Sequence, residues 1–208
     1  MGNSGKQGTS CNDGCHNGGV VPLVRFEGPQ RLEVGTLATF RFVVESQSSR
    51  QLLAGFNIAA SDGLLSVVDG ENEHDEVGEL THNFPSSSID GVAAWQFGWR
   101  APENPGVQTL FGAGLSANGS GGNNGDQSAT TTYLVSVTPR AQPGDANCDT
   151  RLSAADVAAI LALLPTGTAG ECGLADADCN GNVEASDLDA LSAALFDPLR
   201  ETGCVDQP

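Results

Sequence analysis

The chain has 208 residues, of which 9 are Lys or Arg and 26 are Asp or Glu, so its formal net charge is −17. Nucleic acids and anionic membranes bind proteins through Lys and Arg, so this composition excludes both as partners and favours cations. The length suffices for one sandwich-sized domain and a small second one. No run reaches the roughly 18 apolar residues of a membrane-spanning helix.

Six cysteines in an acidic, Lys-poor chain indicate an oxidising compartment outside the cytoplasm. Gly, Asn and Ser follow Met1 directly, without an apolar stretch. We therefore expect a mature form at the cell surface or in the extracellular medium, with a signal peptide that is not in this chain.

Residues 1–19 carry the first motif, Cys11-Asn12-Asp13-Gly14-Cys15-His16. Two cysteines and an adjacent histidine attach a c-type haem, commonly with two residues between the cysteines, whereas this chain has three. Gly14 could absorb the extra residue. The alternative is a Cys11–Cys15 disulfide with His16 as an incidental surface residue, and the motif alone leaves both open. Zinc is disfavoured, because no second Cys or His pair lies nearby.

Residues 20–138 show short apolar runs separated by Gly, Pro and Asn, which predict about eight strands of an immunoglobulin-like antiparallel β-sandwich. Two polar stretches, residues 69–85 and 116–128, are predicted to lie between strands, the second as a loop too polar for the core. The period of two places these side chains in the core: Ala38, Phe40, Phe42, Val44, Phe56, Ile58, Ala93, Trp95, Phe97, Trp99, Val107, Thr109, Phe111, Tyr133, Val135 and Val137.

Residues 139–143 are predicted to be a linker, and in residues 144–208 the apolar period changes from 2 to 3.6. This period predicts two helices from two similar segments. The first helix ends at Pro165 and the second at Asp197-Pro198. Their apolar faces are formed by Val157, Ile160, Leu161 and Leu164, and by Leu188, Leu191 and Leu195.

Each predicted helix follows a twelve-residue loop with oxygen-bearing residues at alternate positions. Ca²⁺ takes six to eight oxygen ligands, and a loop that winds round the ion points every second residue inward. Acidic helix caps would explain one such loop, but two in register favour two calcium sites. Positions 1, 3, 5, 7, 9 and 12 are Asp145, Asn147, Asp149, the Arg151 carbonyl, Ser153 and Asp156 in the first loop, and Asp176, Asp178, Asn180, the Asn182 carbonyl, Glu184 and Asp187 in the second.

The loop–helix pair over residues 144–197 resembles a type I dockerin, which binds two calcium ions and docks onto a cohesin β-sandwich. The resemblance implies a small all-α, EF-hand-like domain and a protein partner. Thr150 stands where the loop usually has Gly, so we expect the first site to be weaker than the second, which has Gly181.

Four cysteines near these loops are predicted to form disulfides, because a module this small cannot rely on its core. If the helices pack antiparallel, each loop end lies near the terminus of the other helix. This favours the pairs Cys148–Cys204 and Cys172–Cys179. The repeat-symmetric alternative, Cys148–Cys172 and Cys179–Cys204, stays open.

The first part of the chain, residues 8–138, resembles the choice-of-anchor V family. These bacterial surface proteins combine an N-terminal Cys-Cys-His motif with a β-sandwich and end in various cell-surface anchors. The resemblance favours one covalent haem c at Cys11, Cys15 and His16, with the dockerin-like module in the anchor position. It is carried by residues 8–16, 54–61, 79–82, 97–102 and 112–119.

A second axial ligand is sought among the remaining histidines, because the only methionine, Met1, lies at the chain terminus. His74 lies among acidic residues and is expected to be solvated. His82 falls in the family-like Glu-Leu-Thr-His segment, so we predict that His16 and His82 bind the iron together. The alternatives are one open axial position, and His82 as a strand-edge residue that hydrogen-bonds a loop.

These features predict an exported mono-haem c-type electron-transfer protein with a calcium-binding docking module. The alternative is a non-redox surface or assembly protein with a Cys11–Cys15 disulfide and calcium-dependent docking. In a variant of both, the module of one chain docks onto the sandwich of the next, and such a head-to-tail contact gives filaments. We do not expect an enzyme, because the sandwich offers no convincing carboxylate pair or Ser-His-Asp set.

Overall fold

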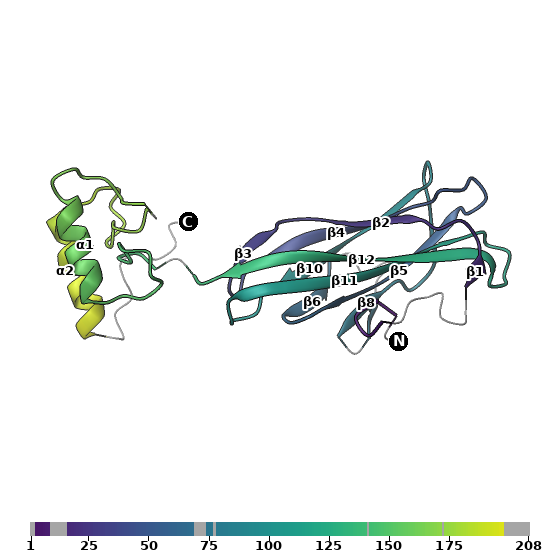
Figure 1. Cartoon of the computed structure of the whole chain (residues 1–208), viewed down its shortest axis with the longest axis horizontal. Helices are drawn as coiled ribbons and strands as arrows, with labels where there is room; N and C mark the ends of the chain where they lie inside the picture. The colour runs from purple at the N-terminus through teal and green to yellow at the C-terminus, as the bar shows by residue number, and fades with distance from the viewer. Residues whose placement is uncertain are drawn as a thin grey trace. The chain divides into compact units, whose positions relative to one another are not determined.

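The computed structural model describes residues 3–8, 16–68, 74–76, 78–140, 142–171 and 173–197. The chain divides into two compact units, Met1–Thr138 and Pro139–Pro208, which we name the strand unit and the helix unit (Figure 1). The prediction of a mainly β protein is confirmed, because strands build the whole framework of the larger unit.

The strand unit has twelve strands in its described residues, whereas the sequence predicts about eight. The difference lies in strands of two or three residues, such as β1, β3, β7 and β9, which are too short to show a period of two. The strands are β1 (Asn17–Gly18), β2 (Leu23–Glu27), β3 (Arg31–Glu33), β4 (Leu37–Glu45), β5 (Leu53–Ala60), β6 (Leu64–Val67), β7 (His74–Glu76), β8 (Glu79–Thr81), β9 (Ser86–Ser87), β10 (Val92–Arg100), β11 (Gly106–Ala117) and β12 (Asn124–Thr138).

These strands form two sheets that enclose one core (Figure 1). The larger sheet has eight strands along the path β1-β12-β11-β5-β8-β7, with β3 paired to β12 and β9 paired to β5. The smaller sheet has the order β2-β4-β10-β6. The long hairpin of β11 and β12 pairs antiparallel from Gly106↔Val137 to Ser116↔Gln127, and it spans the length of the larger sheet.

Aromatic rings from both sheets fill the core. The rings of Phe56, on the larger sheet, and Trp95, on the smaller, have centroids 4.7 Å apart. The indole N–H of Trp99 donates to the Asp62 carbonyl at 3.0 Å, so this ring is buried without an unpaired donor. The predicted inward-facing residues of β4, β5, β10 and β12 lie in the core or pack against it.

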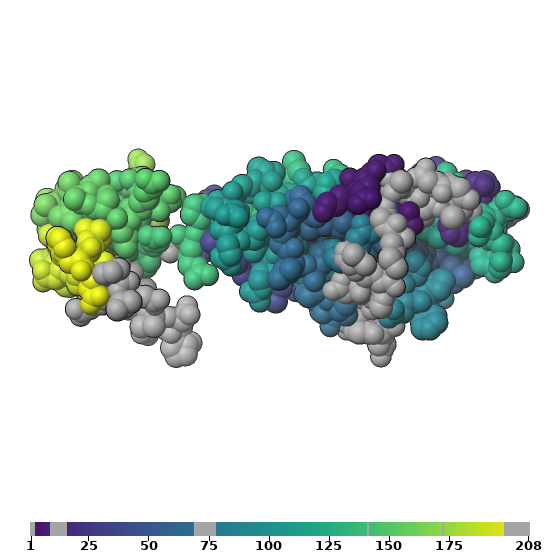
Figure 2. Space-filling model, turned by 90° about the horizontal axis from the view of Figure 1, so that it is seen from below, coloured from purple at the N-terminus to yellow at the C-terminus, as the bar shows by residue number. Residues whose placement is uncertain are grey.

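The predicted phase of β11 is wrong. Val107 is 66% exposed, and Leu110 rather than Phe111 packs in the core. The reason is that apolar side chains occur on both faces of β11, because part of the outer face of the larger sheet, beside Phe111, is also covered. The described N-terminal residues lie against this face: Lys6 Nζ donates to the Ala60 carbonyl, and Ser4 Oγ donates to Glu79 Oε1 (Figure 2).

The two predicted polar stretches also differ from the structure. Residues 69–85 include β7 and β8, and Leu80 in β8 is fully buried. Residues 116–128 include the end of β11 and the start of β12, where Ser116, Asp126 and Ser128 are buried. Of these, the Asp126 carboxylate is buried where it finds hydrogen-bond partners, His16 and the Asn118 N–H, which the hydrophobic pattern cannot report.

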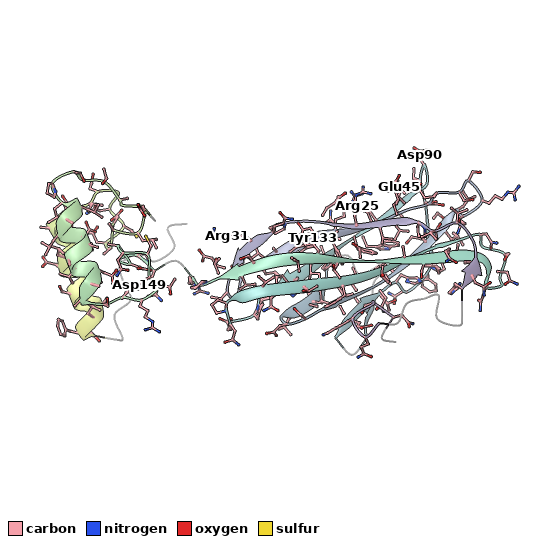
Figure 3. The ribbon with its side chains drawn as sticks, viewed as in Figure 1. Arg25, Arg31, Glu45, Asp90, Tyr133 and Asp149 are labelled. Atoms are coloured by element: carbon pink, nitrogen blue, oxygen red, sulfur yellow. The ribbon has the colours of Figure 1, made fainter. Side chains whose placement is uncertain are left out.

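The outer face of the smaller sheet carries charged side chains in pairs. Arg25 Nη1 lies 3.3 Å from Glu45 Oε2, and both residues are labelled in Figure 3. Hydrogen bonds from Arg41 and Arg25 hold the pKa of Glu27 below its ordinary value. These exposed pairs keep the outer faces of β2 and β4 hydrated and add little to stability.

The helix unit contains α1 (Ala154–Leu163) and α2 (Ala185–Phe196). Ile160 and Leu191 are fully buried between them, with the other predicted apolar residues packed around these two except Leu161. Leu161 is 52% exposed, which corrects its predicted place on the inner face. It lies about 100° round the helix from Ile160, outside the apolar stripe. Neither helix is long and apolar enough to cross a membrane.

The close approach of the two sheets at Gly112 gives a stability prediction. A Cβ on Gly112 would lie 2.5 Å from Phe42 Cε2 and 2.7 Å from Phe26 Cζ. We expect Gly112→Ala to lower the free energy of unfolding by about 1–3 kcal/mol in urea titrations, because the packed rings must move. Gly122→Ala is the matched control, since nothing lies within 4 Å of its Cβ. Equal midpoints for the two variants would contradict this packing.

Candidate calcium loops and histidine sites

The second predicted calcium loop, residues 176–187, is closed by carboxylates at its first and last positions. Asp176 accepts the backbone N–H groups of Asn180 (3.1 Å) and Gly181 (2.8 Å). Asp187 is fully buried and accepts the backbone N–H of Glu184 at 2.8 Å. These bonds fold the loop back on itself, so that its alternate side chains converge.

Three carboxylates converge in this loop. One oxygen from each of Asp176, Asp178 and Asp187 lies within 4.8 Å of the others, the single such acidic group found among the described residues. Two oxygens on opposite sides of one Ca²⁺ are about 4.6–5.2 Å apart, so this spacing suits that ion. Hydrogen bonds from Ser186 and Asn180 lower the pKa of Asp178, which favours the charged form that a cation binds.

The first loop, residues 145–156, has the same hydrogen-bond pattern. Asp145 accepts the N–H groups of Asp149 (3.1 Å) and Thr150 (2.8 Å). Asp156, also fully buried, accepts the N–H of Ser153 at 2.8 Å. The first and last predicted ligand residues therefore make equivalent backbone hydrogen bonds in the two loops.

The third position distinguishes the loops. Asn147 stands in the first loop where the second has Asp178, and the third position is the one that completes the group of three converging carboxylates in the second loop. The Asn147 side chain donates to Asp149 Oδ2 at 3.0 Å. The predicted backbone ligands, Arg151 and Asn182, each donate their N–H to the side chain two residues earlier, both at 2.9 Å.

Each loop ends at a helix N-terminus. Ser153 and Glu184 are the N-cap residues, and the side chains of Asp156 and Asp187 accept the N-cap N–H groups from the third helical position. A carboxylate in the first turn is stabilised by the helix dipole. The last residue of each loop thus fixes both the loop and the start of the helix.

Residues at positive φ mark the tight turns. At the sixth position, Gly181 has φ 89° and Thr150 has φ 71°. A β-branched residue in this conformation is strained by roughly 1–2 kcal/mol, whereas Gly adopts it freely. The structure therefore gives a physical basis for the predicted difference between the loops.

Two of the four nearby cysteines are described, and Cys148 and Cys179 are each disulfide-bonded. Their predicted partners, Cys172 and Cys204, lie outside the described residues. The pairing therefore stays a prediction.

The predicted haem cysteines, Cys11 and Cys15, also lie outside the described residues, but His16 is described. Its Nδ1 lies 3.0 Å from Oδ2 of the buried Asp126, whose other oxygen accepts the Asn118 N–H at 2.8 Å. A metal would therefore bind through Nε2. Sequence reasoning missed Asp126, because its stretch reads as a polar loop.

The other predicted axial ligand, His82, packs on β5. A Cβ on Gly55 would lie 2.4 Å from its Cε1, so only Gly leaves room for this ring. Its Nδ1 lies 3.1 Å from both the backbone N and the carbonyl O of Phe56. With the proton on Nδ1, the ring donates to the carbonyl and keeps a lone pair on Nε2.

Both histidines belong to the outer face of the larger sheet. Leu115 of β11 pairs with Gly55 and with Ser128, and Asp126 lies two residues from Ser128, so all four share one face. β12 and β5 flank β11, so the strand that contacts His16 and the strand that contacts His82 are about 10 Å apart. His74 lies in β7, and its side chain is outside the described residues.

Thr150 gives a second stability prediction. Thr150→Gly removes the Cβ that is strained at positive φ, and Thr150→Ala keeps it. We expect the free energy of unfolding of the helix unit to be about 1 kcal/mol higher in the Gly variant than in the Ala variant. Urea titration in the presence of calcium measures it. A less stable Gly variant would show that Thr150 is not strained.

Comparisons with known proteins give structural likenesses only. No family model and no curated protein matches the chain. A cohesin module from a Clostridium perfringens family 33 glycoside hydrolase matches with a TM-score of 0.43 and 12% identity, covering 58% of this chain and 98% of that one. The CARDB domain of a Pyrococcus furiosus protein, in complex with di-metal ions, has a TM-score of 0.35 and 16% identity, covering 57% and 96%. Both TM-scores lie below 0.5, so the likenesses do not identify a function.

Proposed function

We propose that this protein is an exported surface or assembly protein whose helix unit binds two calcium ions and docks onto a protein partner. The convergence of Asp176, Asp178 and Asp187, in a loop whose hydrogen-bond pattern recurs at residues 145–156, carries the proposal. The helix unit is then a duplicated, all-α calcium module of the dockerin type.

Calcium has a structural role in this proposal. The loop at residues 176–187 holds three carboxylates close together, and a bound cation offsets their mutual repulsion. Because binding requires the folded loops, the binding free energy adds to the stability of the unit.

Leu161 on α1 and Phe196 on α2 are 52% and 89% exposed, and apolar side chains of this size are the kind that a protein partner covers.

A matched pair of variants tests the calcium function. We expect isothermal titration of the full chain to give two calcium ions in the wild type and one in Asp187→Asn, because the buried carboxylate closes the second loop. Asp189→Asn removes the same charge from an exposed position of the same helix and should keep two. Wild-type protein that binds no calcium at millimolar concentration would refute the proposed function.

A second candidate function is electron transfer by one covalent haem at Cys11 and Cys15. The specific observation in its favour is the contact of His16 Nδ1 with the buried Asp126, because metal-binding histidines commonly donate their other ring N–H to a carboxylate. His16 and His82 would hold the iron through Nε2. Bound there, the haem would supply one-electron redox chemistry.

Asp126 gives the test of this candidate. After expression with a cytochrome maturation system, we expect a Soret band and a higher midpoint potential in Asp126→Asn, because a neutral amide makes His16 a weaker electron donor. Asp90→Asn, an exposed change on the same unit, should leave the potential unaltered (Figure 3). A colourless wild-type protein would eliminate this candidate.

A further inference from the structure

The fourth position of each calcium loop holds a disulfide-bonded cysteine in a left-handed conformation. Cys148 has φ 63° and Cys179 has φ 58°, and both take part in disulfides. Among the described residues, the other non-glycine residues with positive φ are Asp90 and Thr150. Asp tolerates this conformation through local hydrogen bonds, whereas Cys does not.

This turn determines where two ligand side chains point. In the second loop, Cys179 lies between Asp178 and Asn180, and the N–H of Asn180 donates back to Asp178 Oδ1 at 3.1 Å. In the first loop, the N–H of Asp149 donates to Asn147 Oδ1 at 3.0 Å across Cys148. The left-handed fourth residue therefore brings the third and fifth positions to one side.

A strained conformation persists only where its surroundings enforce it. A disulfide at the strained residue does so, because it removes many alternative loop conformations from the ion-free ensemble. The disulfide therefore orders the loop before calcium binds, and less of the binding free energy is lost in ordering it. The first loop depends on its disulfide more than the second does, because Thr150 adds a second strained residue where the other loop has Gly181.

We propose that Cys148 and Cys179 are positioning residues of the calcium sites, whose disulfides hold the loops in their binding conformation before the ion arrives. The inference rests on the proposed calcium function and adds to it a coupling between disulfides and ion. Linkage makes that coupling reciprocal, so calcium also protects the two disulfides from reduction by the same factor.

The first test compares calcium affinities of the full chain. We expect Cys148→Ser/Cys179→Ser to weaken calcium binding about tenfold, within the usual range of coupling between sites, with the larger loss at the first loop. Cys11→Ser/Cys15→Ser is the control and should bind as the wild type does. Cys148→Gly/Cys179→Gly relieves the left-handed strain without a crosslink and should also stay weak. Wild-type affinity in either the Ser or the Gly variant would overturn the inference.

A second measurement needs no variant. Dithiothreitol gives two electrons and two protons to each disulfide, which yields two thiols while the reagent closes to its cyclic disulfide. Alkylation and peptide mass spectrometry then measure the reduced fraction of Cys148 and Cys179 at equilibrium, in mixtures of reduced and oxidised dithiothreitol with calcium or with chelator. We expect calcium to raise about tenfold the ratio of reduced to oxidised reagent that is needed for half-reduction. Equal ratios, in protein shown to bind two ions, would overturn the inference and leave the calcium function standing, whereas wild-type protein that binds no calcium defeats both.

Discussion

The helix unit depends on two buried carboxylates, Asp156 and Asp187. Each has no exposed surface, and each accepts N–H groups from its own loop and from the N-cap of the helix that follows. Without these oxygens, several backbone donors would be buried unpaired, at about 1–3 kcal/mol each. The loop, the start of the helix and the apolar packing around Ile160 and Leu191 are therefore parts of one arrangement.

The same arrangement explains why calcium suits this unit. In the loop at residues 176–187, three carboxylates that backbone donors hold in place bring their oxygens together, and a hard cation is the natural counterion there. The left-handed residues at the fourth and sixth positions allow the chain to wind tightly enough for this. Where Gly181 takes such a conformation freely, Thr150, Cys148 and Cys179 are held in it by their surroundings.

A buried carboxylate also organises the N-terminal end of the larger sheet. Asp126 on β12 fixes the His16 ring and the Asn118 backbone together, and the N–H of Gly19 donates to its carbonyl at 3.1 Å. The ring of His82 lies on the same face, in the space that Gly55 leaves by having no side chain. The face that carries the histidines is thus built from backbone and polar contacts, and it is separate from the aromatic core between the sheets.

The sequence predicts some of these features well because they leave a spacing in the chain. Alternate oxygens at residues 145–156 and 176–187, and the alternation of Phe40 with Phe42, are visible without a structure. The phase of β11 could not be predicted, because apolar side chains occur on both of its faces and the described N-terminal residues lie beside Phe111 on the outer one. The burial of Asp126 depends on His16, which is 110 residues away in the chain, and no local pattern reports that contact. The left-handed turns at Cys148 and Cys179 leave no period in the sequence, because cysteine rarely adopts this conformation.

The most direct test of this account is the number of calcium ions that the full, oxidised chain binds, measured by native mass spectrometry during calcium titration. The account predicts two ions per chain, with the loop at residues 176–187 filled before the loop at residues 145–156. A chain that stays free of specifically bound calcium through the titration would contradict it.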